Sequence, residues 1–345
     1  ASGATVKRKH TSMPVLLDVN QLTTRFYSTD GVVHALNQVG FHIEPGETLG
    51  VVGESGSGKS VTMMSLIGLI PQPPGKIEGG EAHFHVDNGD TIDLLSLSES
   101  QLQRVRGKHI GFIFQDPISS LNPVLTIGQQ ISESIIAHLK ISAAEAKKRT
   151  INLLTEVGIA DAAARYNAYP HQFSGGMRQR VMIAIAVACQ PKLVIADEPT
   201  TALDVTVQAQ IIELMKRLQA EMGMAVVWIS HDLGVVAGLA DRVMVMYGGT
   251  IVESAQVDDL YDHPQHPYTI GLLGAIPGAG DQGNKLVSIE GQPPDLLSEL
   301  NFCPFADRCP HTFDRCLAER PPLIQVRPNH YAACFYDVDK GTPRP

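Results

Sequence analysis

The residues with the clearest chemistry form a glycine-rich stretch of eight positions: Gly53, Glu54, Ser55, Gly56, Ser57, Gly58, Lys59 and Ser60. The stretch fits G-x-x-x-x-G-K-[ST] and lies between a run that predicts a strand, 48–52, and a run that predicts a helix, 61–70. Glycines let the backbone curl so that its N–H groups can bind a β-phosphate, and a helix N-terminus adds its dipole. Lys59 would then reach the β- and γ-phosphates, and the Ser60 hydroxyl would bind Mg²⁺. An ordinary glycine-rich turn is the weaker interpretation, because this strand–turn–helix context is the one that the motif requires.

Two carboxylates follow a second apolar run, 193–196, at Asp197 and Glu198. A buried strand that ends in carboxylates is costly unless they meet a cation. We therefore expect Asp197 to hold Mg²⁺ through water and Glu198 to polarise an attacking water molecule. The alternative is a strand that simply reaches solvent at its end.

A third motif, Ser174, Gly175 and Gly176, begins a run that predicts a helix over 173–189. Such a helix start can receive an anion, although Ser-Gly-Gly is also common in loops. A single chain does not need a second γ-phosphate site for its own nucleotide. In a head-to-tail pair of chains, however, each chain could offer this turn to the nucleotide held by the other.

Strands and helices alternate around these motifs. Buried strands are predicted at 110–114, 192–197 and 224–229, a helix at 205–222, and a mostly helical segment at about 126–172. This alternation predicts an α/β fold with a parallel sheet and a helical insert. Proline and glycine become frequent after about 255, so we place a boundary near 255–275 and expect a separate small C-terminal module.

Composition limits the classes of protein that remain. The chain has 345 residues, 43% of them hydrophobic, a net charge of −9 and a pI of about 5.8. It has no apolar run long enough to span a membrane, and its first 14 residues do not resemble a secretory signal. The acidic balance disfavours a duplex-DNA binder. The sequence therefore predicts a soluble, cytoplasmic, acidic protein.

Over about residues 15–255, the ordered set of motifs resembles the nucleotide-binding subunit of an ABC transporter. The resemblance implies ATP and Mg²⁺ as cofactors. Gln115 matches the glutamine that senses the γ-phosphate, Mg²⁺ and the membrane subunit, and His231 matches the switch histidine that holds the γ-phosphate. Asp204 belongs to the matching D-loop, Thr201-Ala-Leu-Asp204. The resemblance also implies an aromatic residue that stacks on adenine near Phe26 or Tyr27; Phe26 fits the family spacing better, and the alternative for either is a core residue.

Two further segments resemble the ATPases of dipeptide and oligopeptide importers: Phe114–Pro123, and His266–Thr269 followed by Gly271-Leu-Leu. The implied fold is a P-loop ABC ATPase core at 15–255, with an antiparallel β subdomain and a helical subdomain at about 117–172. A flexible N-terminus, 1–14, would precede it, and a small cysteine-rich C-terminal extension, 256–345, would follow. Residues 173–177 match the signature motif of the family, in which Phe173 and Met177 replace the usual leucine and glutamine.

The resemblance implies an ATPase subunit that powers import of di- and oligopeptides at the cytoplasmic face of the plasma membrane. Its implied partners are a second homologous ATPase subunit, two transmembrane permease subunits and an extracytoplasmic peptide-binding protein, with no nucleic acid. Relatives carry nickel, sugars and other solutes, so these remain alternatives. A soluble ABC ATPase without a transport role is the other alternative.

Four cysteines lie close together near the C-terminus with the spacing C-x5-C-x6-C-x17-C: Cys303, Cys309, Cys316 and Cys334. Structural zinc prefers tight C-x2–4-C pairs, which are absent here. Looser loops with four thiolates can hold a 4Fe–4S cluster, which is the prediction, with zinc, disulfides or free thiols as alternatives. The resemblance agrees, because some peptide-importer ATPases carry such a cluster in this extension.

Overall fold

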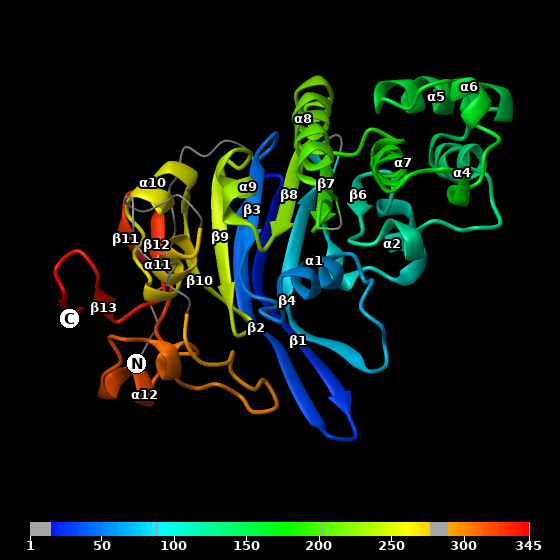
Figure 1. Cartoon of the computed structure of the whole chain (residues 1–345). Helices are drawn as coiled ribbons and strands as arrows, with labels where there is room; N and C mark the ends of the chain where they lie inside the picture. Colours follow the sequence, from blue (N-terminus) through cyan, green and yellow to red (C-terminus); the bar gives the residue numbers. More distant parts are fainter. Residues whose placement is uncertain (1–14, 87–88, 202, 277–288, 345) are drawn as a thin grey trace.

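The computed structural model of the chain describes residues 15–86, 89–201, 203–276 and 289–344. The expected flexible N-terminus lies outside these residues. A mixed sheet runs through the molecule, with an antiparallel sheet beside it and a helical region at one end (Figure 1). Within the described part, none of the helices combines the length and hydrophobicity needed to cross a bilayer.

The larger sheet has the strand order β11-β12-β10-β9-β3-β8-β7-β6. Its strands β9, β3, β8, β7 and β6 run parallel, as the apolar runs predict for strands covered on both faces. The bounds are β3 (Thr48–Val52), β6 (Ile110–Ile113), β7 (Leu193–Asp197), β8 (Ala225–Ser230), β9 (Arg242–Tyr247), β10 (Thr250–Gln256), β11 (Ile324–Arg327) and β12 (His330–Ala332).

The smaller sheet is antiparallel, with the order β2-β1-β4-β5. Its inner residues, such as Leu22 and Phe84, share one core with Met63 and Leu66 of α1 and with Val51 of β3. This sheet therefore supports the segment between β3 and α1. The bounds are β1 (Leu17–Ser28), β2 (Gly31–Ile43), β4 (Gly75–His85), β5 (Thr91–Asp93) and α1 (Lys59–Leu66).

The helical region lies beyond β6, at the right of Figure 1, where α4, α5 and α7 pack against one another. Thr126, Ser142 and Ser174 begin these three helices, because each hydroxyl accepts a hydrogen bond from a backbone N–H three residues later. The bounds are η2 (Leu94–Ser96), α2 (Glu99–Val105), α3 (Pro117–Ser120), α4 (Ile127–Leu139), α5 (Ala143–Glu156), α6 (Ala162–Arg165), η3 (Pro170–Gln172) and α7 (Gly175–Val187). Two more helices, α8 (Val205–Met222) and α9 (Leu233–Ala237), follow in the chain.

The C-terminal part is joined to the larger sheet instead of standing apart from it. Strand β12 pairs antiparallel with β10, and β11 pairs with β12, so both add to that sheet. This pairing satisfies backbone groups that an open edge at β10 would leave exposed. The C-terminal part and the core therefore share one sheet. The remaining elements are α10 (Val257–Asp262), α11 (Pro267–Gly274), η4 (Ala306–Arg308), α12 (Asp314–Ala318), β13 (Tyr336–Asp337) and β14 (Thr342–Pro343).

Candidate functional site

The glycine-rich stretch connects β3 to α1, which begins at Lys59. Gly53, Gly56 and Gly58 have φ values of 149°, 79° and 102°, a backbone conformation that residues with a side chain rarely adopt. A Cβ atom on Gly53 would lie 2.2 Å from the carbonyl oxygen of Met246, so the loop can approach β9 only with glycine at this position. The loop is thus curled as the sequence predicts.

Lys59 and Ser60 lie in the first turn of α1. The Lys59 ammonium donates hydrogen bonds to the carbonyl oxygens of Gly53 and Glu54, at 2.8 and 2.9 Å, and so spans the loop. Burial lowers the pKa of Lys59. The Ser60 hydroxyl donates to Oδ1 of Asp197 at 2.8 Å, which brings the end of β7 to the start of α1.

Asp197 is buried at the last position of β7. Burial raises the pKa of its carboxyl group, and the hydrogen bond from Ser60 acts in the opposite direction. A hydroxyl beside a buried carboxylate is a donor set that suits Mg²⁺, which usually takes few protein ligands and completes its shell with phosphate and water. The residues present therefore fit the predicted cation.

Glu198 is the centre of a polar cluster. Its backbone is left-handed, with φ at 45°. Its Oε2 atom lies 3.2 Å from Nε2 of Gln115 and 3.3 Å from Nδ1 of His231. The structure thus brings together the three side chains that the sequence proposes for catalysis, although they come from three separate loops.

Thr201, the first residue of the predicted D-loop, is a member of this cluster that the sequence did not predict. The Thr201 hydroxyl donates to Oε2 of Glu198 at 2.9 Å and helps to fix its orientation. The signal available was a hydroxyl three positions after a carboxylate, in a turn. That spacing is common for local side-chain hydrogen bonds.

The other predicted nucleotide-binding residues lie elsewhere. The Ser174 hydroxyl accepts a hydrogen bond from the Met177 N–H at the start of α7. The Asp204 carboxylate likewise accepts one from the Val207 N–H at the start of α8. Gly176 approaches Val207 closely, so the two helix starts are neighbours. Phe26 lies on β1, paired with residues of β2 and β4. The described hydrogen bonds of Ser174 are local and do not join it to the glycine-rich loop of its own chain.

The four C-terminal cysteines are free thiols, with Cys309 partly exposed and the other three buried. Burial raises the pKa of Cys303 to about 11 and that of Cys334 to about 12. Among the described residues, no group of three or more His, Cys, Asp or Glu side chains is arranged to hold a metal ion. The side-chain arrangement thus gives no support to the predicted 4Fe–4S cluster or to zinc.

Three features define the class of protein to which this site belongs: the loop that joins a buried parallel strand to a helix, the Ser60–Asp197 contact and the carboxylate of Glu198. They are the parts of a P-loop nucleotide hydrolase.

Comparisons with known proteins narrow that class. The family model described as "ABC transporter" matches residues 36–201, and the model described as "Oligopeptide/dipeptide transporter, C-terminal region" matches residues 252–316. The oligopeptide transport ATP-binding protein OppD of Bacillus subtilis is 51% identical over 92% of this chain and 87% of its own length. The probable peptide ABC transporter ATP-binding protein y4tR of Sinorhizobium fredii is 50% identical over 93% and 95%. The chain belongs to the ATP-binding proteins of the oligopeptide/dipeptide ABC transporters.

A solved structure agrees with the fold. A dimeric ATP-binding cassette in a post-hydrolysis state, bound to ADP and Pi, superposes with a TM-score of 0.61 at 30% identity. The match covers 70% of this chain and 98% of that one. The chain is therefore an ABC-type ATPase subunit.

Proposed function

We propose that this chain hydrolyses ATP to power the import of di- and oligopeptides through separate permease subunits in the membrane. The observation that carries the proposal is the convergence of Gln115, Glu198 and His231 beside the Ser60–Asp197 pair. The names of the curated relatives, and the match to the oligopeptide/dipeptide C-terminal region, support peptide over nickel or sugar as the solute.

Within this proposal, each group has a role. The N–H groups of residues 53–58 and the Lys59 ammonium bind the β- and γ-phosphates, and Phe26 stacks on adenine. Ser60, Asp197 and Gln115 would hold Mg²⁺, which would supply charge neutralisation on the phosphates. Glu198 accepts a proton from the attacking water, and His231 holds the γ-phosphate side of the site.

The peptide assignment is tested in the assembled transporter. We expect addition of a peptide-loaded extracytoplasmic binding protein to raise the ATPase rate severalfold, because transport and hydrolysis are coupled. The measurement is phosphate release from reconstituted vesicles, with the same binding protein free of peptide as the control. Stimulation by a nickel- or sugar-loaded binding protein, and none by the peptide-loaded one, would assign the solute differently.

The proposed working unit is a head-to-tail pair of this chain with a second, homologous ATPase subunit. Ser174, Gly175, Gly176 and Asp204 would act on the nucleotide bound by the partner's glycine-rich loop. The neighbouring starts of α7 and α8 support this assignment, because they place the signature turn and the D-loop side by side. Two permease subunits and an extracytoplasmic binding protein would complete the assembly, with this chain on the cytoplasmic face of the membrane.

The proposed domain boundaries are 15–255 for the nucleotide-binding domain, with a helical subdomain at about 117–172, and 256–345 for the extension. The start of the C-terminal family match, at residue 252, supports the second boundary.

We also keep the 4Fe–4S cluster as a proposal for the extension. The charges of Cys316 and Cys309 help to raise the pKa of Cys303, and those of Cys303 and Cys309 help to raise the pKa of Cys334. The Cys303 N–H also donates to the Cys316 carbonyl at 2.9 Å. Backbone N–H groups also point at two of the sulfurs, those of Cys309 and Cys334, at 3.4 Å each. A cubane binds its four thiolates through four different irons, so its ligands lie further apart than those of a single ion.

Metal analysis tests this proposal. We expect anaerobically purified protein to contain about four irons per chain and to absorb broadly in the visible range. Cys316→Ser should remove the iron while the glycine-rich loop stays able to bind ATP, whereas Cys189→Ser, which changes the cysteine outside the extension, should keep the iron. Wild-type protein without iron after anaerobic purification would overturn the cluster, and one zinc per chain would favour zinc.

A further inference from the structure

The carboxylate of Glu54, the second residue of the glycine-rich loop, is paired with an arginine 254 positions later in the chain. Nη1 of Arg308 lies 2.7 Å from Oε2 of Glu54, and Nη2 lies 3.0 Å from Oε1. This two-point geometry is the strong form of an arginine–carboxylate pair. The Arg308 side chain is only 5% exposed and the Glu54 side chain 27%, so the guanidinium group is largely shielded from water.

Arg308 is held firmly on its other sides. Nε donates to the Glu290 carbonyl at 2.9 Å, Nη2 to the Ile289 carbonyl at 3.2 Å and Nη1 to the Tyr247 hydroxyl at 3.1 Å. Together with the two bonds to Glu54, these bonds employ all five N–H donors of the guanidinium group. A lysine could not reproduce this arrangement.

The backbone of Glu54 is anchored to the same region. Its N–H donates to the hydroxyl of Tyr268 in α11 at 2.8 Å, and Tyr268 is fully buried. The Tyr268 ring packs against Tyr247 and Phe305, whose ring centroids lie at 4.5 and 5.3 Å. Side chain and backbone of one loop residue are thus both fixed by the C-terminal part of the chain.

Glu54 presents a physical problem for a loop that binds phosphates. An unpaired carboxylate in that loop would repel the negative charge of ATP, and its side chain could pull the backbone N–H groups out of position. Arg308 removes both difficulties, because it neutralises the carboxylate and fixes where it lies.

We propose that Arg308 is a positioning residue for nucleotide binding, through which the C-terminal segment sets the affinity of the glycine-rich loop for Mg–ATP. This inference rests on the nucleotide site proposed above. Arg308 is the last residue of η4 and lies between Cys303 and Cys309. A change in the conformation of this cysteine-containing segment would therefore move Arg308 and, through Glu54, the glycine-rich loop.

The test measures Kd for Mg–ATP by calorimetry on the full-length chain, and kcat and KM on the assembled transporter. We expect Arg308→Ala to raise Kd and KM about tenfold with little change in kcat, because an unpaired carboxylate then faces the phosphates. Glu54→Gln combined with Arg308→Ala should bind ATP within about threefold of Glu54→Gln alone, because no charge then remains to be neutralised. Arg308→Lys should fall between wild type and Arg308→Ala.

Arg149→Ala is the matched control, because Arg149 forms an exposed pair with Glu145 on α5. A folded Arg308→Ala variant with wild-type Kd would overturn the proposal. Equal weakening with and without Glu54→Gln would also overturn it, since a merely structural role predicts that result. If Arg308→Ala does not fold, a wild-type Kd for Arg308→Lys overturns the proposal instead. Lys59→Ala distinguishes failure of the Arg308 proposal from failure of the nucleotide site on which it rests: if Lys59→Ala binds ATP normally, the proposed nucleotide site itself is wrong.

Discussion

Replacement of Glu198 by glutamine is expected to reduce ATP hydrolysis about 100-fold or more while ATP binding stays nearly intact. The reason is geometric. Phosphate binding is assigned to the loop at 53–58 and to Lys59, whereas Glu198, which contacts Gln115 and His231, is proposed to accept the proton of the attacking water. Glutamine preserves the size and the hydrogen bonds of the side chain but cannot accept the proton. The measurements are phosphate release and Kd for Mg–ATP on the same preparation.

The same variant tests the head-to-tail pair. With hydrolysis blocked, ATP should hold the pair closed, so that a cysteine placed near Ser174 crosslinks to one placed near the partner's glycine-rich loop. The control is Glu213→Gln, a change on α8 away from the cluster. Hydrolysis at the wild-type rate, in a transporter whose second site is separately disabled, would remove Glu198 from its role. Crosslinking that is equal with and without ATP would contradict the closure of the pair.

Much of the fold follows from local sequence patterns. The predicted strand at 48–52 and the predicted helix at 205–222 match β3 and α8 residue for residue. An unbroken apolar run specifies the buried strand, and the Asp204 cap specifies where the helix begins. The meeting of Gln115, Glu198 and His231 also follows, since each lies just after a parallel strand and these strand ends share one edge of the sheet.

The contacts that fix the C-terminal part could not be predicted in this way. Arg308 and Glu54 are far apart in sequence, and neither lies in a periodic pattern that would show its partner. The pairing of β12 with β10 is equally hidden, because β12 is short and its histidine resembles a surface residue. Local propensity carries no information about such long-range pairs.

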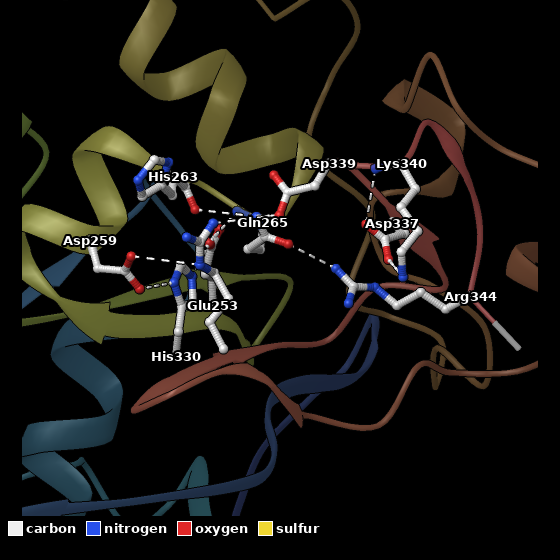
Figure 2. Close-up of polar contacts among 10 residues, drawn as sticks. Glu253, Asp259, His263, Gln265, His330, Asp337, Asp339, Lys340 and Arg344 are labelled. Carbon is white, nitrogen blue, oxygen red and sulfur yellow. Dashed lines mark hydrogen bonds and ion pairs between the residues drawn. The ribbon is translucent and has the colours of Figure 1, made fainter.

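That histidine, His330, is the centre of a buried charged group. Its Nε2 lies 2.7 Å from Oε1 of Glu253 and its Nδ1 lies 2.6 Å from Oδ2 of Asp259, so it bridges β10 and α10 (Figure 2). The side chains of His330 and Glu253 are fully buried. Glu253 also accepts the backbone N–H groups of Gln265 and His266, just before α11. The group therefore ties four parts of the C-terminal region together.

We expect His330→Ala to lower the free energy of unfolding by about 3 kcal/mol, because it leaves the buried Glu253 carboxylate without its cationic partner. Denaturant unfolding of the full-length chain measures the change, which should appear in the midpoint and not in the slope. His263→Ala is the control, since His263 lies nearby with an exposed side chain. A midpoint for His330→Ala equal to that of the control would show that the charged group contributes nothing.

The same group predicts a pH dependence. Burial alone would lower the pKa of His330, but the hydrogen bonds and charges of Glu253 and Asp259 outweigh burial, so the pKa is raised in the folded chain. Arg327 also faces Asp259, at 3.8 Å. A raised folded pKa means that the stabilisation is complete below the unfolded value of about 6.5 and is lost as the pH rises through the folded value. The difference in unfolding free energy between wild type and His330→Ala should therefore shrink from about pH 6 to about pH 9. A difference that stays constant or grows over this range would mean that His330 is neutral in the folded protein.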